Sequence, residues 1–244
     1  MIKVLAIGNS FSNNAMRYLY QIARAAGVDL KCVNLFIGGC PLYTHYQNML
    51  DDDRAYGLLV NGFSTGFTVS IREALRADQW DYITLQQASR FSFDFETFEP
   101  YISELAQYIR DYQPKAKLVI HQTWAYAEGS KQLEKVEIDH QYQMYERLTD
   151  AYAKAAEAID AEKIIPCGEA MQNLLRMGAE VIHADGAHAS EGLGCYTLGC
   201  TWFETLTGVS CIGNTFRDVR VPMTEEEFIL GQNAAHKAAA DVRL

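Results

Sequence analysis

The chain has 244 residues, of which 49% are hydrophobic and 21% charged, so it carries enough apolar material for the core of one α/β domain. Its 31 acidic and 21 basic residues give a formal net charge of −10, which argues against nucleic acid and membrane surfaces as partners and favours a neutral or weakly charged ligand. No apolar run approaches the roughly 20 residues that span a bilayer.

Short apolar runs alternate with amphipathic segments, a pattern typical of a parallel sheet with helices on both faces. Strands are predicted at 2–7, 30–36, 82–85, 117–121 and 163–166. Helices are predicted at 13–26, 70–77, 95–112, 133–159, 169–177 and 190–206, the first capped by Ser12. We therefore expect one flavodoxin-like, three-layer α/β/α domain over residues 1–244, with a five-stranded parallel sheet.

Residues 40–69 depart from this pattern, because Tyr, Asn and Gly are scattered through them without clear periodicity. A loop of that length inside a compact domain is usually functional, so a lid or insertion is predicted here. In such sheets ligands bind at the carboxyl ends of the strands. The chemistry is therefore expected just after the predicted strands, at one edge of the sheet.

The segment after the first strand reads Gly8-Asn9-Ser10-Phe11-Ser12. Gly8 allows a tight strand-to-helix turn from which Ser10 projects, beside backbone N–H groups at the start of a helix. A nucleophilic serine needs this setting, because the tetrahedral intermediate places an oxyanion next to it. Alone, the segment fits a helix cap or a phosphate loop equally well.

A second chemical signal is Asp185-Gly186-Ala187-His188. A serine nucleophile needs a base, and the base needs a carboxylate on its other ring nitrogen. An aspartate three residues before a histidine on a glycine-containing turn supplies both from one loop. Alone, this segment also fits an ordinary surface turn before a helix.

The two segments together resemble the first and last blocks of the SGNH, or GDSL-type, serine hydrolases. The resemblance spans nearly the whole chain and implies that Ser10 is the nucleophile, His188 the base and Asp185 the third triad member. Asn9 stands where the family usually has aspartate. Some carbohydrate-esterase relatives are similar to this chain in carrying glutamine at the third block, which implies hydrolysis of a small ester, such as an O-acetyl group on a carbohydrate.

The same resemblance implies an oxyanion hole built from the Ser10 amide, the Gly39 amide and a side-chain amide. The family's third block is normally Gly-x-Asn-Asp, with the asparagine amide as the oxyanion donor, whereas this chain reads Gln86-Gln87. We expect Gln87, with Gln86 as the alternative, to donate to the oxyanion. Strand alternation lets only one of them face Ser10.

Four further residues are candidates for substrate contact, namely His45, Arg90, Trp124 and Tyr126. The two aromatic side chains follow the fourth strand at the same edge, where they either stack on a sugar or an acyl group or simply cover the end of the sheet. No cofactor is expected.

Two other functions remain open. A zinc site made from His183, Asp185 and His188 lacks an evident further ligand. A non-catalytic ligand- or carbohydrate-binding domain on the same scaffold fits the divergent third block.

The six cysteines form no Cys-x-x-Cys pair, so we expect small buried thiols of a reducing compartment. Met1-Ile2-Lys3 leads directly into an apolar strand pattern without a secretory signal. The chain as written is therefore expected in the cytoplasm, or in the periplasm or medium if a leader has been removed.

Overall fold

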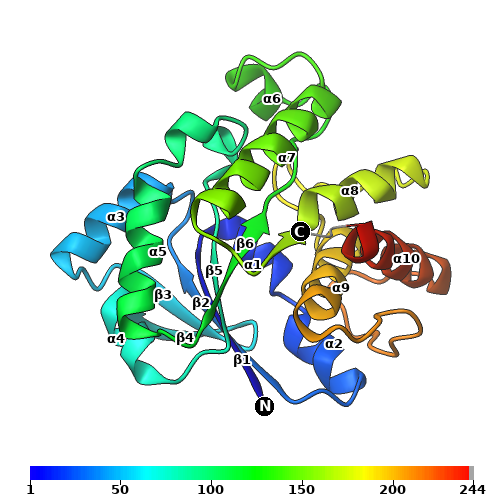
Figure 1. Ribbon diagram of the computed structural model, residues 1–244. Coiled ribbons are helices and arrows are strands. Elements are labelled where there is room, and N and C mark those ends of the chain that lie inside the picture. The colour runs from blue at the N-terminus through cyan, green and yellow to red at the C-terminus, as the bar shows by residue number, and fades with distance from the viewer. Residues whose placement is uncertain (242–244) are drawn as a thin grey trace.

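The computed structural model describes residues 1–241 as a mixed seven-stranded sheet with helices on both faces (Figure 1). The strands are β1 (Ile2–Gly8), β2 (Leu30–Phe36), β3 (Tyr56–Val60), β4 (Phe63–Val69), β5 (Tyr82–Leu85), β6 (Lys117–Gln122) and β7 (Lys163–Pro166). The helices are α1 (Ser10–Ala15), α2 (Leu19–Ala25), α3 (Leu42–Asp51), α4 (Ile71–Ala77), α5 (Tyr101–Tyr112), α6 (Lys131–Lys135), α7 (Gln141–Ala158), α8 (Cys167–Arg176), α9 (Leu193–Thr207) and α10 (Glu225–Asp241), with 3-10 helices η1 (Ser89–Phe91) and η2 (Phe95–Thr97).

The three-layer α/β/α architecture is confirmed, but the predicted sheet of five parallel strands is wrong in number and direction. The order across the sheet is β4-β3-β2-β1-β5-β6-β7. The five predicted strands form its parallel part, β2-β1-β5-β6-β7. β3 and β4 run antiparallel and extend the sheet beyond β2.

Both additional strands come from residues 40–69, so the prediction of a long loop there is wrong. The turn between β3 and β4 is Asn61-Gly62, with φ values of 53° and 87°, as a two-residue hairpin turn of type I′ requires. A Cβ atom at Gly62 would lie 2.8 Å from the carbonyl oxygen of Arg17, so glycine is needed for space as well. The Asn61 side chain accepts the N–H of Cys32 in β2 at 3.0 Å, which anchors the hairpin.

Three helix predictions also need correction. The helix predicted at 13–26 begins at Ser10 and breaks between α1 and α2, and Asn9, not Ser12, caps it. The helix predicted at 133–159 divides into α6 and α7, separated by Glu137 with a φ of 56°. The helix predicted at 95–112 divides into the 3-10 helix η2 and the α-helix α5. α3 and α10 were not predicted.

The central strands of the sheet are buried on both faces. They therefore hold the carboxyl edge of the sheet, where the chemistry is expected, in a fixed position. β1 is continuously buried from Val4 to Gly8, as expected for a central parallel strand. Figure 1 shows α3, α4 and α5 gathered on one face of the sheet and α2, α9 and α10 on the other. The buried apolar side chains of both layers form one continuous cluster.

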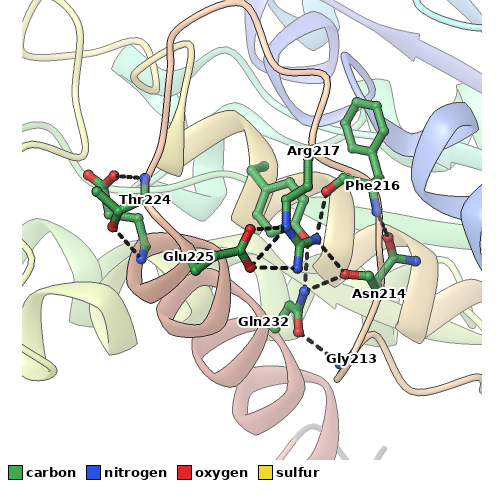
Figure 2. A network of polar contacts seen from close by, with 9 residues as sticks. Gly213, Asn214, Phe216, Arg217, Thr224, Glu225 and Gln232 are labelled. Carbon is green, nitrogen blue, oxygen red and sulfur yellow. Dashed lines mark hydrogen bonds and ion pairs between the residues drawn. The ribbon is translucent and has the colours of Figure 1, made fainter.

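The C-terminal part of the chain is held by a polar network around α10 (Figure 2). Arg217 forms a bidentate ion pair with Glu225, with Nε 2.9 Å from one carboxylate oxygen and Nη2 3.0 Å from the other. Gln232 donates to the Asn214 carbonyl oxygen at 2.9 Å and accepts the N–H of Gly213 at 2.8 Å. These bonds hold the loop before α10 against a helix that itself packs on α8 and α9.

Two properties expected from composition can be compared with the structure. All six cysteines are buried and free, as predicted. Within residues 1–241, every helix is too short or too polar to cross a membrane.

Candidate active site

Ser10 begins α1 directly after the end of β1, at the carboxyl edge of the sheet. The turn leaves no room for a side chain at position 8, because a Cβ atom at Gly8 would lie 2.9 Å from Oε1 of Gln86. Glycine at position 8 therefore lets β1 pass directly into α1 beside the neighbouring strand β5. This local geometry is what the sequence predicted for the segment.

Asn9 fixes the turn through both ends of its side chain. Its Oδ1 accepts the N–H of Phe11 at 3.0 Å and the Nε2–H of Gln86 at 2.8 Å, and its Nδ2 donates to the carbonyl oxygen of Cys40 at 3.0 Å. The side chain is 1% exposed. Asn9 therefore ties the end of β1 to the ends of β2 and β5.

The structure brings Ser10, His188 and Asp185 together. The Ser10 Oγ lies 2.8 Å from Nε2 of His188, and Nδ1 of the same ring lies 2.7 Å from Oδ2 of Asp185. His188 and Asp185 side chains are 40% and 52% exposed, so the group is open to solvent on one side. The order hydroxyl–imidazole–carboxylate is the arrangement through which an imidazole can take a proton from a serine.

The Asp185 carboxylate is oriented by its own loop. Its Oδ1 accepts the N–H groups of Ala187 at 3.0 Å and His188 at 2.8 Å, which leaves Oδ2 for the imidazole. Partial burial disfavours its charge, but these N–H donors and the His188 ring outweigh burial and lower the pKa of Asp185 to about 2. Asp185 is therefore ionised at neutral pH and holds the proton of the ring on Nδ1.

Segments after β6 hold the loop of Asp185 and His188 in place. Three consecutive carbonyl oxygens of that loop are acceptors: Asp185 from the Gln132 side chain, Gly186 from the Ala127 amide, and Ala187 from the Trp124 indole. The Trp124 ring also stacks on Phe11 with 4.2 Å between centroids, and Phe11 in turn lies 5.8 Å from the His188 ring. Trp124 therefore links the serine turn to the histidine loop.

Two backbone amides are free to receive an oxyanion. Within residues 1–241, neither the Ser10 N–H nor the Gly39 N–H has a hydrogen-bond acceptor. The Asn9–Cys40 bond holds the turn at Gly39 beside the serine turn. Free donors next to a nucleophile can stabilise negative charge in a tetrahedral intermediate.

Neither glutamine is placed as the sequence predicted for an oxyanion donor. Gln87 donates to the carbonyl oxygen of Thr97 at 2.8 Å and accepts the N–H of Leu42 at 2.9 Å. Gln86 donates to Asn9, and its Oε1 lies 2.7 Å from Nδ1 of His121. Both side chains are 1% exposed, so they connect loops inside the protein instead of facing Ser10.

Three of the four predicted substrate contacts are buried, and two of these, His45 and Trp124, are completely enclosed. His45 is completely buried and lies 2.8 Å from the Tyr56 hydroxyl through Nδ1, and complete burial lowers its pKa to about 3. Trp124 is also completely buried, so it packs and donates a hydrogen bond instead of stacking on a ligand. Sequence reasoning missed this supporting role because the partner, Ala187, is 63 residues away.

Of the other two predicted contacts, Tyr126 is 6% exposed, whereas Arg90 lies at the surface. The Tyr126 hydroxyl is 2.8 Å from Ser89 Oγ, and burial raises the pKa of Tyr126 above its ordinary value, despite that bond and the nearby Arg90 charge. Arg90 is exposed, and its Nη1 donates to the carbonyl oxygen of Gly39 at 2.9 Å. η1 therefore connects the segment after β6 with the turn at Gly39.

The proposed zinc ligands do not converge. His183 directs Nε2 to the carbonyl oxygen of Ala125 at 3.0 Å, away from the His188 ring that contacts Ser10. No cluster of three or more His, Cys, Asp or Glu side chains arranged for a metal ion occurs in the described part of the chain.

Comparisons with known proteins add a family and a fold to this geometry. The model of the family described as "Domain of unknown function (DUF4886)" matches residues 3–238. The crystal structure of a DUF4886 family protein from Bacteroides uniformis has a TM-score of 0.91 and 36% identity, covering 98% of this chain and 95% of that one. No curated protein matches the sequence.

More distant structures share the fold. A protein from Slackia heliotrinireducens assigned to the SGNH hydrolases has a TM-score of 0.61 and 23% identity, covering 84% of this chain and 98% of its own. A carbohydrate esterase family 3 protein from Talaromyces cellulolyticus has a TM-score of 0.54 and 11% identity, covering 85% and 97%. The fold is therefore the one that SGNH hydrolases use.

Proposed function

Because the chain belongs to the DUF4886 family and has the fold of SGNH hydrolases, we propose that it is a serine esterase with Ser10, His188 and Asp185 as its catalytic triad. The observation that carries the proposal is the pair of contacts at the His188 ring, 2.8 Å to Ser10 Oγ and 2.7 Å to Asp185 Oδ2. Two distant parts of the chain, the serine turn and the loop of Asp185 and His188, thus bring three side chains together in the order that acyl transfer needs.

In the proposed mechanism, Ser10 Oγ attacks the acyl carbon of the ester while His188 Nε2 takes its proton. The amides of Ser10 and Gly39 bind the resulting oxyanion. His188 then protonates the leaving alcohol, which gives an acyl-enzyme on Ser10. Water repeats the sequence with His188 as base, releases the acid and regenerates the serine.

For the substrate, we propose a small ester, with an O-acetyl group on a carbohydrate as the preferred case. The net charge of −10 disfavours anionic substrates, and a carbohydrate esterase is among the proteins that share the fold. SGNH hydrolases usually add a side-chain amide to the oxyanion hole. In this chain the proposed hole consists of backbone donors alone, because Gln86 and Gln87 are bonded elsewhere.

The direct test is hydrolysis of p-nitrophenyl acetate by Ser10→Ala. We expect turnover to fall by roughly 10⁴-fold or more, because the acyl acceptor is lost while the fold keeps its contacts. Ser64→Ala, an exposed serine in β4, is the matched control and should keep full activity. Full activity in Ser10→Ala would overturn the assignment, and an inactive wild type that binds acetylated glycans would favour the non-catalytic alternative.

A further inference from the structure

A cavity of about 480 Å³ opens beside the turn at Gly39. It lies between the start of α3, the 3-10 helices η1 and η2, and the start of α5. Its lining includes the side chains of Tyr43, Arg90, Phe91, Glu96 and Tyr101. We call it the Tyr43–Tyr101 cavity, and its volume lies in the range of about 300–1,000 Å³ that small-molecule sites occupy.

The cavity adjoins the candidate active site through η1. Arg90, which lines the cavity, donates from Nη1 to the carbonyl oxygen of Gly39 at 2.9 Å. The preceding residue, Ser89, lies 2.8 Å from the Tyr126 hydroxyl, and the residue after Tyr126 donates to the loop that carries His188. A molecule with its ester at Ser10 and its remaining part beyond Gly39 would therefore enter this cavity.

The charged groups of the cavity have no ionic partners of their own. None of the three charged residues of the lining, Arg90, Glu96 and Glu99, takes part in an ion pair within residues 1–241. The Arg90 guanidinium lies over the Phe91 ring, 4.7 Å from its centroid, which fixes its position without neutralising it. The donors of Arg90 other than Nη1, and the carboxylate oxygens of Glu96, are therefore available inside this concave surface to a polar ligand.

Aromatic rings also line the Tyr43–Tyr101 cavity. Tyr43 is 51% exposed and Phe91 37% exposed. The Tyr43 ring packs edge-on against Tyr101, with 5.3 Å between centroids, so it is held while one side stays open. Exposed rings of this kind can stack on the C–H faces of a flat apolar or sugar ring.

We infer that the Tyr43–Tyr101 cavity holds the alcohol part of the ester as a sugar ring, so that the enzyme selects its substrate by the alcohol. This inference rests on the proposed function of Ser10. A pyranose offers C–H faces for Tyr43 and Phe91 and hydroxyl groups for Arg90 and Glu96. A long acyl chain would instead desolvate Arg90 and Glu96 without replacing the hydrogen bonds that these groups make to water.

The kinetic test compares esters with one acyl group and different alcohols. Wild-type protein is assayed on mono-O-acetylated methyl glucoside, galactoside and xyloside and on ethyl acetate; ethyl octanoate, which shares its alcohol with ethyl acetate, supplies a separate comparison of the acyl group. We expect kcat/KM for at least one sugar ester to exceed that for ethyl acetate by about 10-fold or more. Equal values for the sugar esters and ethyl acetate, or preference for the octanoate, would overturn the inference.

Variants locate that preference in the cavity. Tyr43→Ala and Glu96→Gln should each lower kcat/KM for the preferred sugar ester about 10-fold more than for p-nitrophenyl acetate, chiefly through KM. Tyr142→Ala, an equally exposed tyrosine on α7, is the matched control and should change neither value. Equal losses on both substrates would show that the cavity residues act on the fold instead of on the sugar.

Titration separates this inference from the proposed function. Binding of the unacetylated methyl glycosides to Ser10→Ala is measured by calorimetry, with and without Tyr43→Ala. Binding that Tyr43→Ala abolishes supports the sugar site even if wild-type protein hydrolyses no ester. Absence of glycoside binding, together with normal hydrolysis of p-nitrophenyl acetate, would overturn the sugar site and leave the esterase assignment standing.

Discussion

Asn9 makes three hydrogen bonds that together require an amide at this position. Two of them use Oδ1 as an acceptor, for Phe11 and Gln86, and a carboxylate could also make these. The third uses Nδ2 as a donor to the buried carbonyl oxygen of Cys40, which a carboxylate cannot make. Asparagine at this position therefore belongs to the way this chain joins its serine turn to the turn at Gly39.

The variant Asn9→Asp restores the residue that SGNH hydrolases usually have, yet we expect it to weaken this protein. It leaves the Cys40 carbonyl oxygen without a donor and opposes it with a negative charge, which should lower the free energy of unfolding by about 1–3 kcal/mol. Urea denaturation measures the change. Asn13→Asp, on the more exposed side of the same helix, is the control, and an equally or more stable Asn9→Asp would contradict this account.

At the scale of elements, the loop that carries His188 depends on the segment after β6. Its carbonyl oxygens receive donors from Trp124, Ala127 and Gln132, while the indole of Trp124 packs on Phe11. The serine turn and the histidine loop thus share one buried aromatic neighbour. The distance between Ser10 and His188 should depend on this neighbour.

Trp124→Phe tests that dependence, because it keeps the ring against Phe11 and removes the N–H that Ala187 accepts. We expect kcat for p-nitrophenyl acetate to fall roughly 10- to 100-fold through misplacement of His188, with the circular dichroism spectrum unchanged. Trp202→Phe is a close control, since the Trp202 indole nitrogen is buried without a partner within residues 1–241. Equal activities of the two variants would show that the Trp124 hydrogen bond does not position the loop.

At the scale of the whole molecule, two completely buried histidines link stability to pH. Burial lowers the pKa of both His45 and His121 to about 3, from an ordinary value of 6.5. The unfolded chain therefore binds protons below about pH 6.5 that the folded chain does not bind. Stability is fully present above that pH and is lost as the pH falls from about 6.5 towards 3.

His121→Asn removes one of these groups while its amide can still donate to Gln86. Between pH 7 and pH 5, wild-type protein should lose about 2 kcal/mol more stability than the variant. Urea denaturation at the two pH values measures this difference, and the exposed residue His140 supplies the control variant His140→Asn. An identical loss in wild-type protein and His121→Asn would contradict the assignment of a depressed pKa.

The parallel core could be predicted from sequence because its signals are local, whereas the meeting of Ser10, Asp185 and His188 was expected only from the resemblance carried by their two segments together. Each parallel strand is a short apolar run, and the serine turn and the Asp185–His188 loop each lie within a few residues. The hairpin was missed because β3 is only partly buried and β4, the edge strand, is exposed, so neither carries a clear alternation. Its Asn61-Gly62 pair was the signal that would have revealed it.

The surroundings of the triad could not be predicted, because they depend on partners far apart in the chain. Gln87 looks like an oxyanion donor in sequence, but Leu42 and Thr97 occupy its amide. His45 and Trp124 look like ligand contacts, but both are completely buried, His45 against the Tyr56 hydroxyl and Trp124 against the histidine loop. Whether a loop side chain is buried is decided by contacts with distant parts of the chain. Such contacts leave no local pattern in the sequence.

The central claim is that Ser10 is a nucleophile activated by His188. The most direct measurement is labelling with a fluorophosphonate, followed by fragmentation of the tryptic peptide of residues 4–17, which contains Ser10 and the buried Ser12. We predict one phosphonate on Ser10, none on Ser12, and no labelling in His188→Ala. Absence of label from wild-type protein, or label that persists in His188→Ala, would contradict the claim.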